Sequence, residues 1–204
     1  EVGDAIGQRY VEKYFPAASR EKVQQLVANL IAVFPARIDA LDWMSAETKA
    51  KAKEKLAGFR VGVGYPDKWR DYSGLQVVAG EAYGNWQRAE LFDYRRNLAK
   101  LSGPVNRDEW WMTPQTVNAL NLPMQNMIVF PAAILEPTFF DPNADAAVNY
   151  GAIGGVIGHE VVHGFDDIGA LFDAKGNLRN WWTDADMTQF KARGQALAAQ
   201  YSAY

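Results

Sequence analysis

The placement of its histidines constrains this 204-residue chain more than any other feature. The chain contains two of them, and they stand four residues apart in the run His159-Glu160-Val161-Val162-His163. Four residues turn through about 400° of an α-helix, so both imidazole rings leave the same face, one turn apart. That spacing lets two ring nitrogens bind one metal ion at about 2 Å. The segment is therefore expected to be a helix that carries a metal site.

The glutamate between the two histidines adds a chemical role to this geometry. Glu160 points to the side of the histidine face, where it can reach a metal-bound water rather than the metal itself. This is the HExxH arrangement of zinc peptidases, and it predicts one Zn²⁺ ion held by His159 and His163. The alternative is a solvated or core helix that carries two histidines by accident, because short motifs produce false positives.

Composition narrows the other possibilities. Hydrophobic residues make up 49% of the chain and it holds seven tryptophans, so it can bury a core. The net charge of −3 gives no electrostatic footprint for nucleic acid. There is no cysteine, which excludes disulfides and thiolate zinc sites. The lysine-rich stretch 49–55 is expected to be a solvated helix face.

No segment of the sequence predicts a membrane span. The longest nearly apolar run, 146–158, is too short to cross a bilayer. The chain begins with Glu1 rather than Met and shows no secretory signal, so we expect a processed product or an excised piece of a longer protein.

The pattern of apolar residues and breakers predicts a mainly helical chain with a few short strands. Pro35 should kink or split the second helix, and Ser45 should cap the third. Thr183 and Asp186 resemble a capping box at the start of the last helix. The expected helices are 1–15, 19–43, 45–58, 81–101, 143–167 and 183–199, the expected strands are 59–64, 116–120 and 126–130, and a turn is expected at 173–176.

The expected metal-binding helix contains an unusual number of glycines. Each glycine inside a helix costs about 1 kcal/mol relative to alanine. We therefore expect a neighbouring backbone to pack very closely against them. A pairing face of a membrane helix is the rival interpretation, and the short apolar run disfavours it. The four residues are Gly151, Gly154, Gly155 and Gly158.

Several long stretches resemble the neprilysin-type (neprilysin and endothelin-converting enzyme) metallopeptidases. The run VNYGAIGGVIGHEVVHGFDD at 148–167 is similar to the zinc helix of that family, and FDAKGNLRNWW at 172–182 is similar to the segment that follows it. Upstream, DALDWMSAETKAKAKEKL, GYPDKW, MTPQTVNA and NMIVFPAAILEPTFFD also resemble family sequences. The resemblance covers nearly the whole chain, in order, and corresponds to the middle of a much longer family sequence.

The resemblance implies roles for individual residues. His159 and His163 would be zinc ligands, and Glu160 would be the general base that takes a proton from the zinc-bound water. Asp166 would hold one of the histidines from behind, although an exposed aspartate at a helix end is an equally open interpretation. Asn118 and Ala119 match the family's pair that binds the substrate backbone; the alternative is an asparagine that caps a turn.

Some positions depart from the family pattern. Leu120 and Asn121 stand where two aromatic residues are usual, and Met127 stands where a polar residue is common. The family's third zinc ligand is a glutamate from a later helix, and residues 164–204 contain no glutamate. Two histidines alone should hold zinc weakly. The missing ligand is expected from an absent C-terminal segment or from a second chain of the same protein; an aspartate ligand such as Asp184 or Asp186 is a less supported alternative.

Together these features predict a mostly helical α+β fold, the zincin-like half of a catalytic domain, with a small sheet and the HExxH helix beneath it. Residues 1–104 should form a mainly helical segment and residues 105–204 the N-terminal half of the catalytic domain, with its C-terminal part absent. The expected function is a zinc-dependent endopeptidase that acts on oligopeptides, outside the cytoplasm of a bacterium. The alternative is a non-catalytic fragment or binding module with a vacant or weak metal site.

Overall fold

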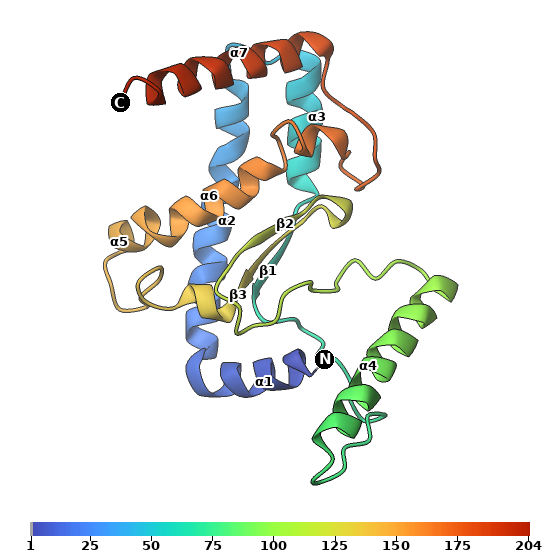
Figure 1. Cartoon of the computed structure of the whole chain (residues 1–204). Helices are drawn as coiled ribbons and strands as arrows, with labels where there is room; N and C mark the ends of the chain where they lie inside the picture. The colour runs from blue at the N-terminus through green and yellow to red at the C-terminus, as the bar shows by residue number, and fades with distance from the viewer. Residues whose placement is uncertain (1) are drawn as a thin grey trace.

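The computed structural model of the chain describes residues 2–204 as a mostly helical α+β fold, which confirms the predicted fold class (Figure 1). The α-helices are α1 (Gly3–Tyr14), α2 (Ala17–Asp39), α3 (Ala46–Ala57), α4 (Ala82–Ala99), α5 (Ala146–Gly151), α6 (Ile153–His163) and α7 (Asp184–Tyr201). The strands are β1 (Arg60–Gly64), β2 (Leu120–Leu122) and β3 (Met127–Pro131), and the short 3₁₀ turns are η1 (Lys100–Ser102), η2 (Pro123–Gln125), η3 (Ala132–Leu135) and η4 (Gly169–Leu171).

The three strands form one sheet in the order β1-β3-β2. Strand β3 lies in the centre, parallel to β1 and antiparallel to β2, with Val61 opposite Ile128 and Asn121 opposite Ile128 on the other side. All five residues of β3 are buried, which is the pattern expected of a central strand. Strand β2 therefore occupies an edge of the sheet.

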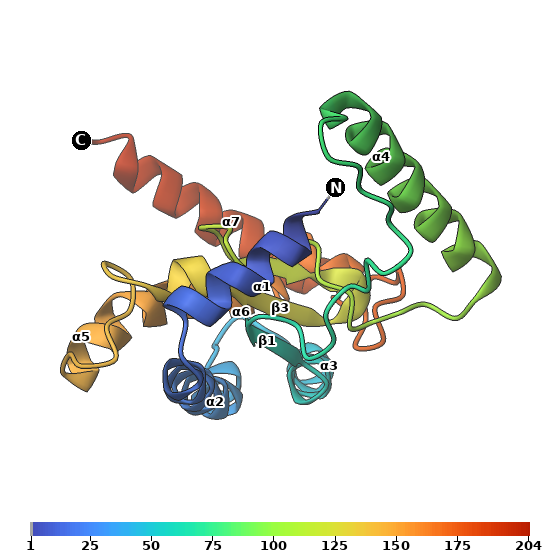
Figure 2. The same ribbon diagram turned by 90° about the horizontal axis from the view of Figure 1, so that it is seen from below.

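Helices α2, α3 and α6 surround this sheet. Helix α2 contacts α3, α6 and β1, and α6 also contacts β2. In Figure 2, α2 and α3 are seen nearly end-on, side by side on the same side of the sheet, while α4 projects away from the rest of the chain. The main core contains Val23 and Val27 of α2, Ile128 and Phe130 of β3, and residues of α6.

Local sequence signals explain where several helices begin. Ser45 caps α3 as predicted, since its side chain accepts a hydrogen bond from the Thr48 amide. Thr183 caps α7 in the same way through the Asp186 amide. Helix α2 continues through Pro35 to Asp39, so of the two predicted effects of this proline, a kink or a split, the split is wrong. The turn at 173–176 is confirmed by a hydrogen bond from the Gly176 amide to the Asp173 carbonyl.

Two predicted elements have different bounds in the structure. The strand expected at 116–120 is instead Leu120–Leu122, so Asn118 and Ala119 precede the strand rather than lie in it. The single helix expected at 143–167 is two helices, because Ala152 leaves the helical conformation with φ −92° and ψ −91°. Asp145 caps the first of them by accepting from the Ala147 amide. The break separates Gly151 from the histidine turn, whereas the other three glycines lie in α6 with the histidines.

The expected close backbone neighbour of the glycine-rich run is absent at most of its positions. Apart from adjacent residues and the backbone of its own helix, a Cβ atom built on Gly151, Gly155 or Gly158 would meet no described atom within 4 Å, and one on Gly154 would meet only ordinary contacts. Close approach occurs later in the chain instead. A Cβ on Gly169 would collide with the His163 carbonyl oxygen, and one on Gly176 would collide with the backbone of Met124.

The lysine-rich face of α3 is only partly solvated. Lys51 pairs with Glu47 and Lys53 pairs with Asp39 at the surface, as expected. Lys55, in contrast, is 1% exposed, so the prediction of a solvated face is wrong at this position. In the structure Lys55 lies on the same buried face of α3 as Thr48, Ala52 and Leu56.

The predicted division near residue 104 falls in the stretch 103–119, which contains no helix or strand. The sheet and the main core nevertheless take residues from both sides of it, since β1 pairs with β3. No helix in the described part of the chain combines the length and apolar character needed to cross a bilayer.

A buried carboxylate joins the beginnings of α3 and α7. Asp186 is 2% exposed and accepts hydrogen bonds from the Ser45 amide (2.7 Å), the Ser45 hydroxyl (2.8 Å), the Thr48 hydroxyl (2.6 Å) and the Thr183 hydroxyl (2.7 Å). Burial alone would raise the pKa of Asp186, but the hydrogen bonds from Thr48, Thr183 and Ser45 outweigh it and lower the pKa to about 2. The ionised carboxylate is therefore the form that stabilises the fold.

We expect the Asp186→Ala substitution to lower the free energy of unfolding by about 2–3 kcal/mol at neutral pH, because it removes the acceptor of one buried hydroxyl, that of Thr48, and of half-buried donors on Ser45 and Thr183. The folded-state pKa lies below the unfolded value of 3.8, so this stabilisation is complete above about pH 4 and is lost as the pH falls towards 2. Urea denaturation at pH 7 and pH 3 measures both effects. The control is Asp184→Ala, which removes an exposed carboxylate from the same turn; equal losses in the two variants would contradict the assignment.

Candidate functional site

The orientation of the histidine pair follows from the buried face of α6. Ile153, Ile157 and Val161, spaced four residues apart, are completely buried in the core. Burial of each such side chain contributes about 1.5–3 kcal/mol, which fixes the rotation of the helix about its own axis. His159 and His163 consequently lie on the opposite, exposed face.

The two rings converge as the sequence predicts. The Nε2 atoms of His159 and His163 lie 2.9 Å apart, and the ring centroids are 4.4 Å apart at an angle of 85°. Two imidazole nitrogens that share a tetrahedral zinc ion stand about 3.4 Å apart. A small separation of the rings would therefore admit an ion between them, so this pair fits a zinc ion.

Asp166 lies behind the pair and holds one ring. Its Oδ2 atom is 2.8 Å from Nδ1 of His163, and its Oδ1 atom accepts from the amides of Ile168 (3.0 Å) and Gly169 (2.7 Å). The carboxylate is thus oriented by two backbone donors. A proton on Nδ1, donated to Asp166, leaves the lone pair of Nε2 directed towards His159, which is the tautomer that a metal ligand requires.

Glu160 occupies a different environment from the histidines. It is 7% exposed, and burial raises the pKa of its carboxyl above the usual value, against the opposing effects of His163, His159 and the Asn121 backbone amide. A carboxyl group with a raised pKa beside two imidazoles is better suited to accept and return a proton than an ordinary exposed carboxylate.

The edge strand of the sheet lies beside the turn of α6 that carries Glu160. The side-chain amide of Asn121, in β2, donates to the Glu160 carbonyl oxygen at 2.8 Å. Asn118 and Ala119 come just before this strand: Asn118 is exposed, and its side-chain oxygen accepts from the Ala119 amide at 2.9 Å, while Ala119 packs into the core. The strand that follows these residues is therefore held against α6 by a hydrogen bond.

Asn121 is a functional candidate that the sequence did not reveal. The sequence marked it as a departure from the family pattern, but its partner 39 residues away is visible only in the structure. Met127, the other marked departure, packs with Leu122 and Val129 in a small second core beneath Trp110. A polar side chain would lose that apolar environment, which explains why methionine suits this position here.

The described residues bring together two candidate metal-binding side chains, His159 and His163. Among residues 2–204, no group of three histidine, cysteine, aspartate or glutamate side chains is placed to hold an ion. The alternative ligand Asp186 binds the start of α3 with both of its oxygens, as described above. Asp184 is exposed in the first turn of α7.

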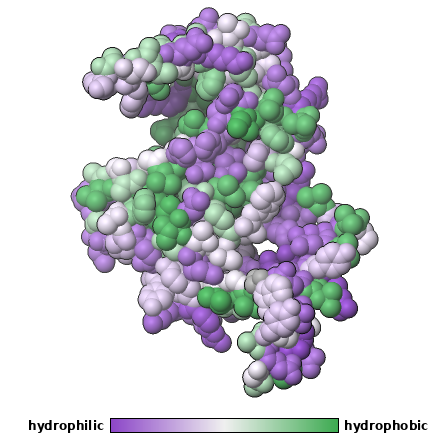
Figure 3. All heavy atoms as spheres, in the orientation of Figure 1, coloured by the Kyte–Doolittle hydropathy of each residue, from purple (hydrophilic) through white to green (hydrophobic). Residues whose placement is uncertain are grey.

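The face around the histidines is open and partly apolar. Val148, Tyr150 and Val162 are exposed on α5 and α6. Figure 3 shows hydrophobic residues gathered at the surface over these two helices. The glycines that meet no neighbour lie on the same two helices, so the surface beside the rings has no bulky side chain at those positions.

Comparison with known proteins finds one family. The models described as peptidase family M13 match residues 1–66 and 118–204. The chain is 39% identical to human endothelin-converting enzyme-like 1 over 206 residues. This match covers 98% of the chain and 26% of the relative. It is also 39% identical over 206 residues to human neprilysin, covering 97% of this chain and 28% of the relative.

Solved structures give the same result. The zinc metalloprotease ZMP1 of Mycobacterium tuberculosis, solved in complex with an inhibitor, superposes with a TM-score of 0.89 at 55% identity, over 99% of this chain and 30% of that one. PepO from Lactobacillus rhamnosis superposes with a TM-score of 0.85 at 37% identity, over 97% of this chain and 32% of that one. The chain therefore spans about a quarter to a third of the length of these relatives.

We expect Asp166→Ala to weaken zinc binding by the 204-residue chain about 10–100-fold, because His163 loses the partner that fixes its tautomer and orientation. Titration with zinc against a competing chelator measures the change. Asp167→Ala is the matched control, since Asp167 is the exposed neighbour in the same turn. Equal zinc affinities in the Asp166→Ala variant and the unmodified chain would show that the carboxylate does not support the site.

Proposed function

The chain belongs to peptidase family M13, and from this premise we propose that it carries the zinc helix of a zinc-dependent endopeptidase that hydrolyses oligopeptides. The observation that carries the proposal is the convergence of the His159 and His163 Nε2 atoms to 2.9 Å, with Asp166 behind one ring and Glu160 beside both. In a helix that carried two histidines by accident, there would be no need for a carboxylate on Nδ1 of one of them. Here Asp166 occupies that place, and two backbone amides fix its orientation.

Each residue has a distinct part in this reaction. His159 and His163 would hold the ion through Nε2, and Asp166 would keep the proton of His163 on Nδ1. A bound zinc ion supplies Lewis acidity, which polarises a carbonyl and acidifies water. Glu160 takes the proton from the water that attacks the scissile carbonyl and transfers it to the leaving amine.

The burial of Glu160 supports this role because it raises the pKa of the carboxyl towards the range in which both proton transfers are feasible. The hydrogen bond from Asn121 to the Glu160 backbone holds this turn against the edge strand. A substrate in extended conformation would then lie along β2, with its backbone recognised by the exposed carboxamide of Asn118 and the neighbouring Ala119. The hydrogen bond from Asn121 to the Glu160 carbonyl oxygen would also keep a substrate on β2 close to Glu160, the proton acceptor.

A second candidate function follows from the number of ligands. A catalytic zinc site normally has three protein ligands and one open position, and the described residues bring two together. By itself the 204-residue chain would then be a non-catalytic module with a weak metal site. In the active enzyme, the third ligand would come from a further segment of the protein or from a second chain. The location outside the cytoplasm of a bacterium stays a prediction.

In the full-length enzyme, Glu160→Gln is expected to lower the rate of peptide hydrolysis about 10²–10⁴-fold while leaving the zinc content unchanged, because the amide cannot accept the proton. Cleavage of a short fluorogenic peptide, together with metal analysis of the same preparation, makes the test. Glu54→Gln, an exposed residue of α3, serves as the control. Normal hydrolysis by the Glu160→Gln enzyme would mean that the assigned base is wrong.

The isolated 204-residue chain is expected not to hydrolyse peptides even with added zinc, since two imidazoles leave the ion weakly held and its geometry undefined. The same fluorogenic assay, run with and without a chelator, checks this. Turnover that the chelator abolishes and that His159→Ala removes would overturn the prediction. Such a result would also require a third ligand within the chain.

A further inference from the structure

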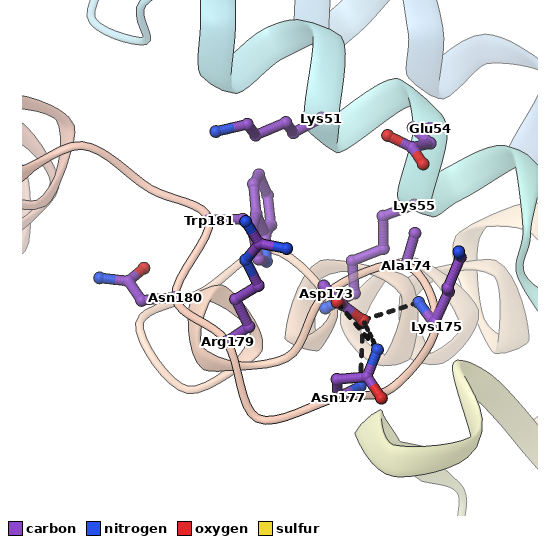
Figure 4. A pocket seen from close by; sticks show the side chains of 10 residues that line it. All are labelled: Lys51, Glu54, Lys55, Asp173, Ala174, Lys175, Asn177, Arg179, Asn180 and Trp181. Atoms are coloured by element: carbon purple, nitrogen blue, oxygen red, sulfur yellow. Dashed lines mark hydrogen bonds between the residues drawn. The ribbon is translucent and has the colours of Figure 1, made fainter.

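Lys55 is a buried cation that the proposed chemistry does not use directly. It is 1% exposed, and its ammonium donates to the carbonyl oxygens of Gly169 and Phe172, both at 2.7 Å. Figure 4 shows its side chain reaching from α3 to the segment after the metal-binding helix, beside Trp181, whose ring centroid lies 5.5 Å from the ammonium. An ammonium buried in this way requires such fixed partners.

One of the two carbonyls that Lys55 binds, that of Gly169, lies between two backbone amides that both donate to Asp166. The Gly169 amide donates to Asp166 Oδ1 at 2.7 Å. The Ala170 amide, in the same peptide group as the Gly169 carbonyl, donates to the Asp166 backbone oxygen at 2.8 Å. Hydrogen bonds to the two ends of one peptide group strengthen each other. Asp166 in turn holds Nδ1 of His163.

Gly169, which links Lys55 to Asp166 and so to the His163 ring, has little room to move. Gly169 sits so close to the end of α6 that a side chain at this position would collide with the His163 carbonyl oxygen. The indole nitrogen of Trp181 also donates to the Gly169 carbonyl, at 3.0 Å. Any movement of Gly169 must consequently break a bond to Lys55, to Trp181 or to Asp166.

We propose that Lys55 is a positioning residue of the metal site: by fixing Gly169, its ammonium keeps the Asp166 carboxylate in the orientation that holds Nδ1 of His163. The proposal rests on the proposed function insofar as His163 is a metal ligand. Burial lowers the pKa of Lys55 to about 8, while Asp166 and Asp173 act in the opposite direction, so the cation and the carboxylate also interact through space.

A purely structural role for Lys55 makes a different prediction. In that case its loss would destabilise the packing of α3 and affect both histidines equally or neither. The chain allows the two roles to be separated, because His159 and His163 are its only histidines and Asp166 holds just one of them. His159 therefore serves as an internal reference.

The experiment compares the metal-free 204-residue chain with its Lys55→Met variant by ¹H–¹⁵N correlation spectra of the imidazole nitrogens at about pH 7. The expected result is that His163 changes from the Nδ1–H tautomer to a mixture while His159 is unaltered, and that zinc affinity falls about 10-fold. Leu56→Ala, a core truncation at the next position of α3, should leave the His163 tautomer unchanged. A wild-type tautomer in Lys55→Met, or the same change in Leu56→Ala, would overturn the proposal.

A second measurement needs no change at Lys55 and stands if Lys55→Met does not fold. In Asp166→Asn the titration of the ¹⁵N-labelled Lys55 ammonium should move to lower pH, because the carboxylate that raises its pKa has been neutralised. Asp167→Asn should not move it. Identical Lys55 titrations in the two variants would overturn the proposal. None of these readouts depends on peptide hydrolysis, so a failure of the proposed function would be recognised separately, by normal activity of the Glu160→Gln enzyme.

Discussion

The burial of one face of α6 is the constraint on which the rest of the structure depends. Ile153, Ile157 and Val161 are completely buried in the core that α2 and the sheet share. This packing leaves the helix a single rotation about its axis, and that rotation places both imidazoles on the open side. Glu160 falls between the two faces, where it is desolvated yet adjacent to the rings. Hydrophobic burial thus determines the geometry of the polar site.

Hydrogen bonds then fix the side-chain orientations that burial leaves undetermined. They converge on the segment that follows α6. Asp166 is held by two amides of this segment, the segment is bound by Lys55, and Asp186 binds its continuation to the beginning of α3. Each of these groups is a charge with several hydrogen-bonding partners, which is the condition under which buried charges are tolerated. Helix α3, remote from the histidines in sequence, thus contacts the segment that holds Asp166 beside His163.

The glycines of α5 and α6, which helices normally disfavour, lie on an open surface. Three of them face no other part of the described chain, so their lack of a side chain serves no packing contact within it. They lie on α5 and α6, and among the described residues no third side chain joins His159 and His163 to make the three protein ligands that a catalytic zinc site normally has. The solved relatives are about three times as long as the matched region.

The sequence by itself determined the helical class, the caps at Ser45 and Thr183, the central strand, and the convergence of His159 and His163, because each depends on local periodicity or on a side chain that binds a nearby backbone group. It placed the edge strand a few residues too early and missed the break at Ala152, since strand pairing and helix interruption depend on distant contacts. Only the tertiary structure decided that Lys55 lies inside, that Asn121 reaches the backbone of Glu160, and that Gly169 rather than the earlier glycines meets a close backbone. The physical reason is that a periodic pattern specifies which face of an element is buried, whereas the partners of that face are selected by the packing of elements far apart in the chain.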